Sequence, residues 1–290
     1  MPEGYADLGT IKLHYVQEGE GDLALLLHGF PDYCASWKAQ LPALAEAGFR
    51  AVAPDLRGYN LSDKPKGVGA YDIDLLVEDV RNLIDALDAP RAHLVGHDWG
   101  GVISWYFAMR YPEYLDRLAI LNSPHPAHVP MGWLRDPRQL LKSWYVFFFQ
   151  IPSVPEHRLA DDDFRNLKRV YFGQKGAFEA DEIEEYIEAA RRTGNMSGPL
   201  NYYRAFLRSN PIRIRSRRRR IDGPVLVLWG DGDAALQPSL AEPPQELVPN
   251  AEVVHFPDAG HWVHKQKPDE INKLLRGFLT AGEKDFGGRV

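Results

Sequence analysis

One aspartate stands where a predicted strand turns into a predicted helix. Asp98 follows the apolar run Ala92 to Val95, and apolar residues then recur at helical spacing between Val102 and Phe107. Glycines lie two residues before it and two and three residues after it. A sharp turn with close helix–strand packing needs such residues, because it leaves no room for a Cβ. The pattern is typical of a turn that presents a nucleophilic side chain.

The residue type narrows the chemistry. An aspartate is already ionised at neutral pH and needs no base to become a nucleophile. It is a poor choice for attack on an ester or amide carbonyl, because the anhydride formed would be at least as reactive as the substrate. It suits displacement at a saturated carbon, with an epoxide oxygen or a halide as the leaving group. A simpler interpretation is that Asp98 only caps the following helix, since Asp is a favoured N-cap residue.

The composition is that of an average globular chain with room for a large core. Of its 290 residues, 44% are hydrophobic and 26% are charged, which suits one α/β domain or a core with an inserted lid. A formal net charge of -6 disfavours nucleic-acid or anionic-membrane binding. The single cysteine, Cys34, excludes an internal disulfide and a cysteine-based metal site. Met1 to Asp7 is no signal peptide and no apolar run reaches membrane-spanning length, so we expect a cytoplasmic protein without a membrane partner.

Short apolar runs alternate with helical stripes along the chain. The run Leu23 to Leu27 is continuous, as in a strand buried on both faces, and an apolar stripe marks a helix over 73–87. This alternation favours a parallel sheet covered by helices on both faces. The other predicted elements are strands at 11–16, 51–53, 92–95, 118–121, 225–228 and 252–256, and helices at 37–47, 161–172, 179–192 and 269–279.

The alternation breaks after Asn122, where prolines and aromatic residues punctuate a long stretch without a buried strand. We interpret residues 127–217 as a helical lid inserted into a core formed by 1–126 and 218–290. The basic stretch Arg213 to Arg220 falls where the lid returns to the core, and no aromatic platform accompanies it. We therefore expect a solvated hinge there and no nucleic-acid site.

A histidine follows the last predicted strand. Ligands of open parallel sheets bind at the carboxyl ends of the strands, and His261 shares that location with Asp98. An imidazole there can take a proton from the water that hydrolyses an alkyl ester. His264 is the competing base, but it stands at the start of the last predicted helix, so we expect it outside the site.

The base needs a carboxylate to hold its other nitrogen and to stabilise the imidazolium. Two candidates, Asp231 and Asp233, follow the strand at 225–228. We choose Asp233 because it lies further into the loop. The chain order nucleophile, acid, histidine is the one that this kind of turn predicts.

Hydrolysis of an ester passes through a tetrahedral oxyanion, which two backbone N–H groups can stabilise. One belongs to Trp99, directly after the nucleophile, and the other to Phe30, in the turn after the strand at 23–27. That turn can also be an ordinary one without a catalytic role.

Opening an epoxide creates an alkoxide, which needs a proton donor opposite the nucleophile. A phenol, with a pKa of about 10, can donate to so basic an oxygen and still be protonated at rest. The lid offers Tyr145 and Tyr203, but the chain has 13 tyrosines and spacing alone does not select these two.

The sequence resembles the epoxide hydrolases of the α/β-hydrolase superfamily, of the soluble mammalian and plant type, over nearly its whole length. The resemblance implies a mostly parallel eight-stranded sheet with helices on both faces and an inserted helical lid. The segments that carry it are His28-Gly29-Phe30-Pro31, Gly96-His97-Asp98-Trp99-Gly100, Phe149-Gln150-Ile151-Pro152, Pro199-Leu200-Asn201-Tyr202-Tyr203-Arg204, and Gly260-His261-Trp262 with Lys267-Pro268.

The same resemblance implies roles for single residues. Tyr145 and Tyr203 match the two tyrosines that hold the epoxide oxygen in that family, and Asp233 matches the acid. A cis peptide is implied before Pro31. The expected wall of the substrate pocket consists of Phe30, Trp99 and Phe149.

Together these features predict an enzyme that converts a small apolar epoxide and water into a vicinal diol, through an alkyl ester on Asp98. No metal or organic cofactor is expected, and the chain is expected as a monomer or a homodimer. A non-catalytic ligand-binding protein with the same fold is an alternative from a different class. A receptor, however, has no need of Asp98, Asp233 and His261 together.

A haloalkane or haloacetate dehalogenase is the alternative enzyme. It would share the nucleophile, and the Trp99 indole N–H could hold the halide. Three features count against it. Phe30 stands where many haloalkane dehalogenases carry Asn, and Trp99 stands where the haloacetate enzymes usually carry Arg. Some dehalogenases place the acid after the strand at 118–121, where this chain has Asn122 and Ser123.

Overall fold

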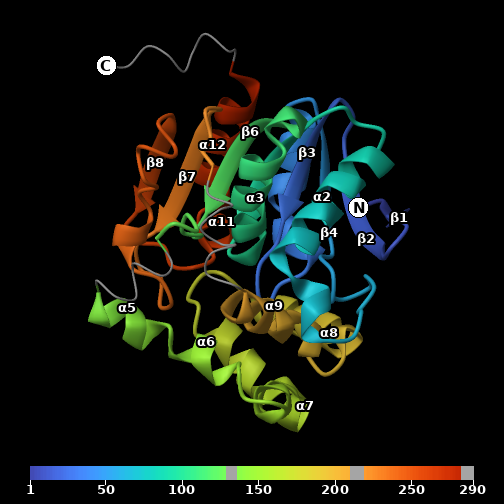
Figure 1. Ribbon diagram of the computed structural model, residues 1–290, viewed down its shortest axis with the longest axis vertical. Coiled ribbons are helices and arrows are strands. Elements are labelled where there is room, and N and C mark those ends of the chain that lie inside the picture. Colours follow the sequence, from blue (N-terminus) through green and yellow to red (C-terminus); the bar gives the residue numbers. More distant parts are fainter. Residues whose placement is uncertain (129–135, 210–218, 282–290) are drawn as a thin grey trace.

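The computed structural model describes residues 1–128, 136–209 and 219–281. A central sheet has helices on both faces, and a further group of helices lies across one end of it (Figure 1). The strands are β1 (Glu3–Asp7), β2 (Lys12–Glu18), β3 (Asp22–Leu27), β4 (Phe49–Pro54), β5 (Ala92–His97), β6 (Leu115–Leu121), β7 (Val225–Gly230) and β8 (Ala251–Phe256).

The eight strands form one sheet in the order β1-β2-β4-β3-β5-β6-β7-β8. β2 runs antiparallel to β1 and to β4, and the other neighbours pair in parallel. The predicted fold, a mostly parallel eight-stranded sheet, is confirmed. β1 was not predicted, because Glu-Gly-Tyr-Ala-Asp lacks an apolar alternation. This edge strand is held by its pairing with β2, where Tyr5 lies opposite His14.

Two apolar cores lie on the two faces of the sheet. Alternate residues of β3 serve different cores, since Leu25 and Leu27 pack into one and Ala24 and Leu26 into the other. The helices α2 (Ile73–Ala86) and α3 (Trp99–Arg110) cover the first face. The second face is covered by α1 (Gln40–Glu46), α11 (Val263–Gln266) and α12 (Pro268–Thr280).

The prediction of a helix over 37–47 was wrong at its start. The segment Cys34–Trp37 is a separate 3-10 turn, and α1 begins only at Gln40. Pro42 then falls in the first turn of α1, where its missing N–H costs no helical hydrogen bond. The helix predicted over 269–279 matches α12 closely.

Among the described residues, five helices come between β6 and β7 in the chain and lie together below the sheet in Figure 1. We call the described part of this region, residues 136–209, the cap. Two of its residues, Tyr145 and Tyr203, share a cavity with Asp98, which directly follows β5. The cap therefore lies over the carboxyl ends of the parallel strands. Its helices are α5 (Pro137–Lys142), α6 (Trp144–Phe148), α7 (Val154–Phe172), α8 (Ala180–Thr193) and α9 (Ser197–Arg208).

The cap differs in detail from the sequence prediction. The helix expected over 179–192 matches α8, but α7 begins at Val154, well before the predicted residue 161. Its residues 161–164 leave the helical conformation, so the predicted stretch is helical only after them. Neither α5, α6 nor α9 was predicted. In α9, Pro199 lies in the first turn, where proline is tolerated.

The sequence leads us to expect neither a membrane partner nor a nucleic-acid site. In the described part of the chain, no helix has both the length and the apolar character needed to cross a bilayer. Of the basic stretch, Arg213 to Arg218 lie outside the described residues. Arg220 pairs with the adjacent Asp222 at 2.5 Å.

Candidate active site

Asp98 occupies the sharp turn between β5 and α3. Its backbone has φ +51° and ψ −117°, a conformation that non-glycine residues adopt only at a cost. The side chain makes no capping hydrogen bond to α3, so the interpretation as a simple helix cap was wrong. Instead, Oδ1 accepts a hydrogen bond of 2.8 Å from the backbone N–H of Phe30.

Neighbouring strands hold the turn in place. The N–H of Asp98 donates to the carbonyl of Leu121 at 3.2 Å, and the Ser123 hydroxyl donates to the carbonyl of Asp98 at 2.8 Å. A Cβ on Gly100 would lie 2.0 Å from the carbonyl oxygen of Leu27, so only glycine lets α3 start this close to β3. The unusual backbone conformation of Asp98 is therefore imposed by its surroundings.

The Phe30 loop approaches the same carboxylate from β3. A Cβ on Gly29 would lie 2.4 Å from the Cβ of Asp98, which explains the glycine directly before Phe30. The peptide between Phe30 and Pro31 is cis, as the family resemblance implied. Trp99 is the first residue of α3, and a helix leaves such N-terminal N–H groups without an internal partner. Because Oδ1 of Asp98 is bound by the N–H of Phe30, Oδ2 faces away from the Phe30 loop.

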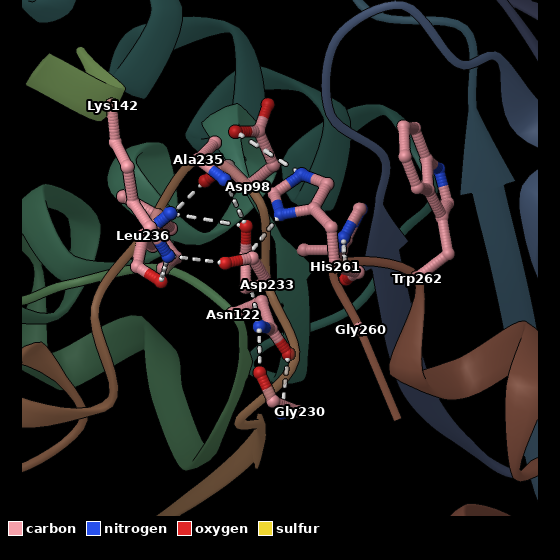
Figure 2. Close-up of polar contacts among 12 residues, drawn as sticks. Asp98, Asn122, Lys142, Gly230, Asp233, Ala235, Leu236, Gly260, His261 and Trp262 are labelled. Carbon is pink, nitrogen blue, oxygen red and sulfur yellow. Dashed lines mark hydrogen bonds and ion pairs between the residues drawn. The ribbon is translucent and has the colours of Figure 1, made fainter. Parts of the chain in front are cut away.

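His261 lies on the open side of Asp98. Its Nε2 is 3.7 Å from Oδ2 of Asp98, and its Nδ1–H donates to Oδ2 of Asp233 at 2.6 Å, as Figure 2 shows. Asp231 lies elsewhere, and its Oδ1 is hydrogen-bonded to Nδ1 of His255 at 2.6 Å. Of the two candidate acids, the structure brings Asp233 to the histidine.

Asp233 is buried, and both of its carboxylate oxygens accept hydrogen bonds. Its Oδ1 accepts from the N–H groups of Ala235, at 2.7 Å, and Leu236, at 3.0 Å, and its Oδ2 also accepts from Asn122 at 2.9 Å. Burial by itself raises the pKa of this carboxyl, but His261 and the N–H donors outweigh it and lower the pKa. Asp233 is thus held as a carboxylate.

The charges around His261 act on its protonation. Burial lowers the pKa of the imidazole, but the carboxylate of Asp233, followed by those of Asp98 and Asp32, outweighs burial and raises the pKa to about 9. At neutral pH the resting imidazole is therefore protonated, with carboxylates on both sides. After Asp233, the charge on Asp98 therefore contributes to the basicity of this histidine.

Tyr145 on α6 and Tyr203 on α9 face Asp98 from the cap. The two rings lie 5.9 Å apart between centroids, nearly perpendicular to each other. Burial, and next the negative charge of Asp98, raise the pKa of both phenols above the ordinary value, so both stay protonated. A hydrogen bond with Trp99 acts in the opposite direction on Tyr203.

Comparison with known proteins agrees with this geometry. Residues 24–268 match the family model described as alpha/beta hydrolase fold. Epoxide hydrolase 4 of Homo sapiens is 38% identical over 279 residues, which cover 93% of this chain and 76% of that protein. The AB hydrolase superfamily protein YfhM of Bacillus subtilis is 37% identical over 279 residues, covering 95% of this chain and 96% of the relative.

Solved structures give the same answer. A variant of an epoxide hydrolase from Bacillus megaterium, in complex with its naphthyloxy-propane-1,2-diol product, superposes with a TM-score of 0.89 at 34% identity, covering 96% of this chain and 100% of that one. The chain belongs to the epoxide hydrolase family of the α/β-hydrolase superfamily. The matches to the three proteins named above cover 93 to 96% of this chain.

In this family member two cavities meet at Asp98, Tyr145 and Tyr203. The larger, of about 660 Å³, runs between α6, α7 and the His261 loop. The smaller, of about 90 Å³, lies on the side of α3 and α5. Phe30 and Phe149 border the larger cavity and Trp99 the smaller, as expected for pocket walls. Both cavities are lined mostly by apolar side chains.

Sequence reasoning missed several residues that organise the site of this epoxide hydrolase homologue. Asn122 binds both Asp233 and the backbone of Gly230. Its position directly after β6, at the same sheet edge, was the available signal. Two cap residues, Gln139 and Lys142, bind the loop of Asp233 and left no signal in the sequence.

Two groups of buried side chains in the described ranges could ligate a metal ion, namely His14, Cys34 and Asp55, and Asp32, His97 and His264. In the second group, His264 contacts Ser36 at 3.0 Å, and burial, followed by His97, lowers its pKa. His264 borders neither of the two cavities at Asp98. It therefore does not compete with His261 for the substrate water.

Proposed function

We propose that this protein hydrolyses epoxides to vicinal diols through a covalent ester on Asp98. The observation that carries the proposal is the arrangement around one cavity. Two protonated phenols, Tyr145 and Tyr203, lie on the cap side, and a carboxylate with one free oxygen lies on the core side. Displacement at a saturated carbon needs a nucleophile on one side and a proton donor on the other.

In the first step, Oδ2 of Asp98 attacks one carbon of the epoxide. The carbon–oxygen bond of the ring breaks, and its electron pair stays on the oxygen. Tyr145 and Tyr203 hold this oxygen and supply its proton. The product is a hydroxyalkyl ester of Asp98.

In the second step, the imidazolium of His261 first releases its Nε2 proton to solvent. Water then adds to Cγ of Asp98 and gives a proton to Nε2 of His261. The negative charge collects on an Asp98 oxygen in front of the N–H of Phe30 and, by its place at the start of α3, that of Trp99. The tetrahedral intermediate then collapses. The alkyl oxygen leaves with a proton from His261, which gives the diol and a neutral carboxyl group on Asp98. That carboxyl group then loses its proton, which restores the carboxylate, and a proton returns to the tyrosinate that the first step left.

The charge on Asp98 links the two steps. In the resting state this carboxylate contributes to the raised pKa of His261, about 9. Esterification removes the negative charge 3.7 Å from Nε2, so the pKa of the imidazole falls when a base is needed. The ester therefore prepares its own hydrolysis.

The cavities define the substrate class. Their lining is mainly apolar, so we propose an epoxide with apolar alkyl or aryl substituents. A larger substituent fits the cavity of about 660 Å³, and only a small one fits that of about 90 Å³. The naphthyloxy-diol bound to the Bacillus megaterium relative supports an aromatic substituent. Besides the epoxide, water is the other proposed partner.

We also propose that the two parts of the chain supply different catalytic groups. Residues 1–126 and 218–290 form the core that carries the nucleophile, the base and the acid. Residues 127–217 form the lid, whose described part is the cap that supplies the tyrosines. The two parts meet at the cavity.

A paired assay tests the proposal. The protein is incubated with styrene oxide and, separately, with a haloalkane, and diol and halide are measured. We expect diol from the epoxide and no halide. Halide release without diol would show a dehalogenase instead, and saturable binding without either product would show a non-catalytic protein.

A further inference from the structure

The first helix of the cap reaches across to the loop that carries the triad acid. From α5, Lys142 Nζ donates to the carbonyl oxygens of Asp233, at 2.6 Å, and Leu236, at 3.3 Å (Figure 2). One turn earlier, Gln139 Nε2 donates to the carbonyl of Ala235 at 2.9 Å. Two cap side chains thus bind the carbonyls of three residues of this loop, namely Asp233, Ala235 and Leu236.

Gln139 also accepts a hydrogen bond from the loop. The N–H of Gln237 donates to its Oε1 at 2.8 Å, and its Nε2 additionally donates to Ser143 at 2.9 Å. Both oxygen and nitrogen of the amide therefore have partners, which a buried amide needs. The loop from Asp233 to Gln237 is held at four of its residues.

The burial of α5 is the reverse of what an ordinary surface helix shows. Gln139 is 1% exposed, whereas Leu141 is 74% exposed. Burying an amide and exposing a leucine costs free energy unless the buried group gains specific partners. Here those partners lie on the acid loop, so the position of Gln139 is best explained by its contacts with that loop.

The loop in turn orients the acid. Oδ1 of Asp233 accepts from the N–H groups of Ala235 and Leu236, the same residues whose carbonyls Gln139 and Lys142 bind. A shift of these peptide units moves the carboxylate, and with it the hydrogen bond of 2.6 Å to Nδ1 of His261. A displacement of about 1 Å in such a contact can cost roughly a hundredfold in rate.

We propose that Gln139 and Lys142 are positioning residues for the ester-hydrolysis step. They act through the loop, on Asp233 and so on His261. The inference rests on the proposed function, because only there do the two half-reactions use different groups. Ester formation uses Asp98 and the two tyrosines, which neither Gln139 nor Lys142 contacts through a hydrogen bond in the described structure. The cap therefore serves both steps, through different helices.

The test separates the two steps. Single turnovers of the full chain with saturating styrene oxide are quenched at intervals, and the ester on Asp98 is followed by mass spectrometry. In Gln139→Leu and Lys142→Met we expect ester decay to slow by roughly ten- to a hundredfold, while ester formation stays within about twofold. The ester then accumulates, which the parent protein does not show to the same extent.

Two further variants control for indirect effects. Leu141→Gln lies between the two positions on the exposed side of α5, and we expect both steps to remain unchanged. Lys142→Arg keeps donors that can reach the carbonyls, and we expect it to restore most of the decay rate. If Gln139→Leu does not fold, Lys142→Met carries the test, because its side chain stands at the half-buried end of α5.

The outcomes separate this inference from the proposed function. His261→Gln is run beside the variants. His261→Gln should trap the ester. If it does so, but the ester decays in Lys142→Met and Gln139→Leu as fast as in the parent, the positioning role is wrong. The same holds if these two variants slow ester formation and ester decay equally. If His261→Gln traps no ester at all, the proposed function itself fails.

Discussion

The sheet edge and the cap hold their functional groups by different means. At the sheet edge, Asp98, His261 and Asp233 each follow a parallel strand directly or within a few residues, so the backbone sets where they lie. In the cap, Tyr145 and Tyr203 lie on the separate helices α6 and α9, and their rings pack against each other. Precision at the sheet edge comes from turns, and precision in the cap comes from packing.

A buried ion pair joins two helices of the cap. Arg204, next to Tyr203 on α9, binds Glu156 on α7 through distances of 2.6 and 3.0 Å. The same guanidinium donates to the carbonyls of Phe149 and Ile151, beyond the end of α6. One arginine thus joins the two helices that carry the tyrosines. The cap is docked on the core by further bonds, such as that of 2.8 Å from the Tyr202 hydroxyl to the carbonyl of Arg57.

This contrast predicts that damage in the two regions stops different steps. The largest effect is expected from Tyr145→Phe combined with Tyr203→Phe. Without either phenol the epoxide oxygen has no proton donor, so ester formation should fall by roughly 10²- to 10⁴-fold, and turnover with it. Quenched-flow mass spectrometry measures the ester. Rapid ester formation in this double variant would show that the cap tyrosines are not the proton donors.

The complementary change lies at the sheet edge. His261→Gln removes the base, so the ester should form at nearly the parent rate and then decay roughly 10²- to 10⁴-fold more slowly. Intact-protein mass spectrometry should show a gain equal to the mass of the substrate. A loss of ester formation in this variant would contradict the claim that damage in the two regions stops different steps.

A stability change sharpens the comparison further. Glu156→Gln leaves the Arg204 guanidinium, 7% exposed, without a carboxylate partner, which should destabilise the protein by about 3 kcal/mol. The control is Glu188→Gln, which breaks an exposed pair with Arg191 in the same cap and should change stability by less than about 1 kcal/mol. Denaturant titrations measure both. Equal effects would contradict the role given to the buried pair.

The smallest effect concerns the charge shared by the two steps. Asp98→Asn mimics the uncharged ester, so the pKa of His261 should lie below the parent value of about 9. The sign follows because a nearby carboxylate favours the imidazolium, and its removal favours the neutral ring. An NMR titration of the ring protons compares the two proteins. An unchanged or raised pKa in the variant would contradict the proposed link between the steps.

The two regions also differ in how far their sequences could be interpreted. At the sheet edge, the glycine pattern around Asp98 predicts a strand–turn–helix, and strand ends predict the neighbourhood of His261 and Asp233. These features are local, and parallel strands bring their carboxyl ends together by geometry. The role of Asn122 was not predicted, because an amide directly after a strand indicates no function unless its partner is known.

Little of the cap could be derived from its own sequence. Tyr145 and Tyr203 were singled out only through the family resemblance, and α5, α6 and α9 were not predicted. Contacts such as that of Lys142 with the loop at Asp233 join segments far apart in the chain, and no local pattern encodes them. The residues 161–164 interrupt α7 within a stretch that was predicted as a helix, although three consecutive aspartates are poor helix formers.

The central claim is that an Asp98 oxygen ends in the product and is replaced from water. One turnover with excess enzyme in ¹⁸O-labelled water tests it most directly, with the diol and the Asp98 peptide analysed by mass spectrometry. Two steps through an ester put the label into the carboxyl group of Asp98 and leave the diol unlabelled. Label in the diol, with an unlabelled Asp98, would mean that water attacks the epoxide directly and that no ester forms.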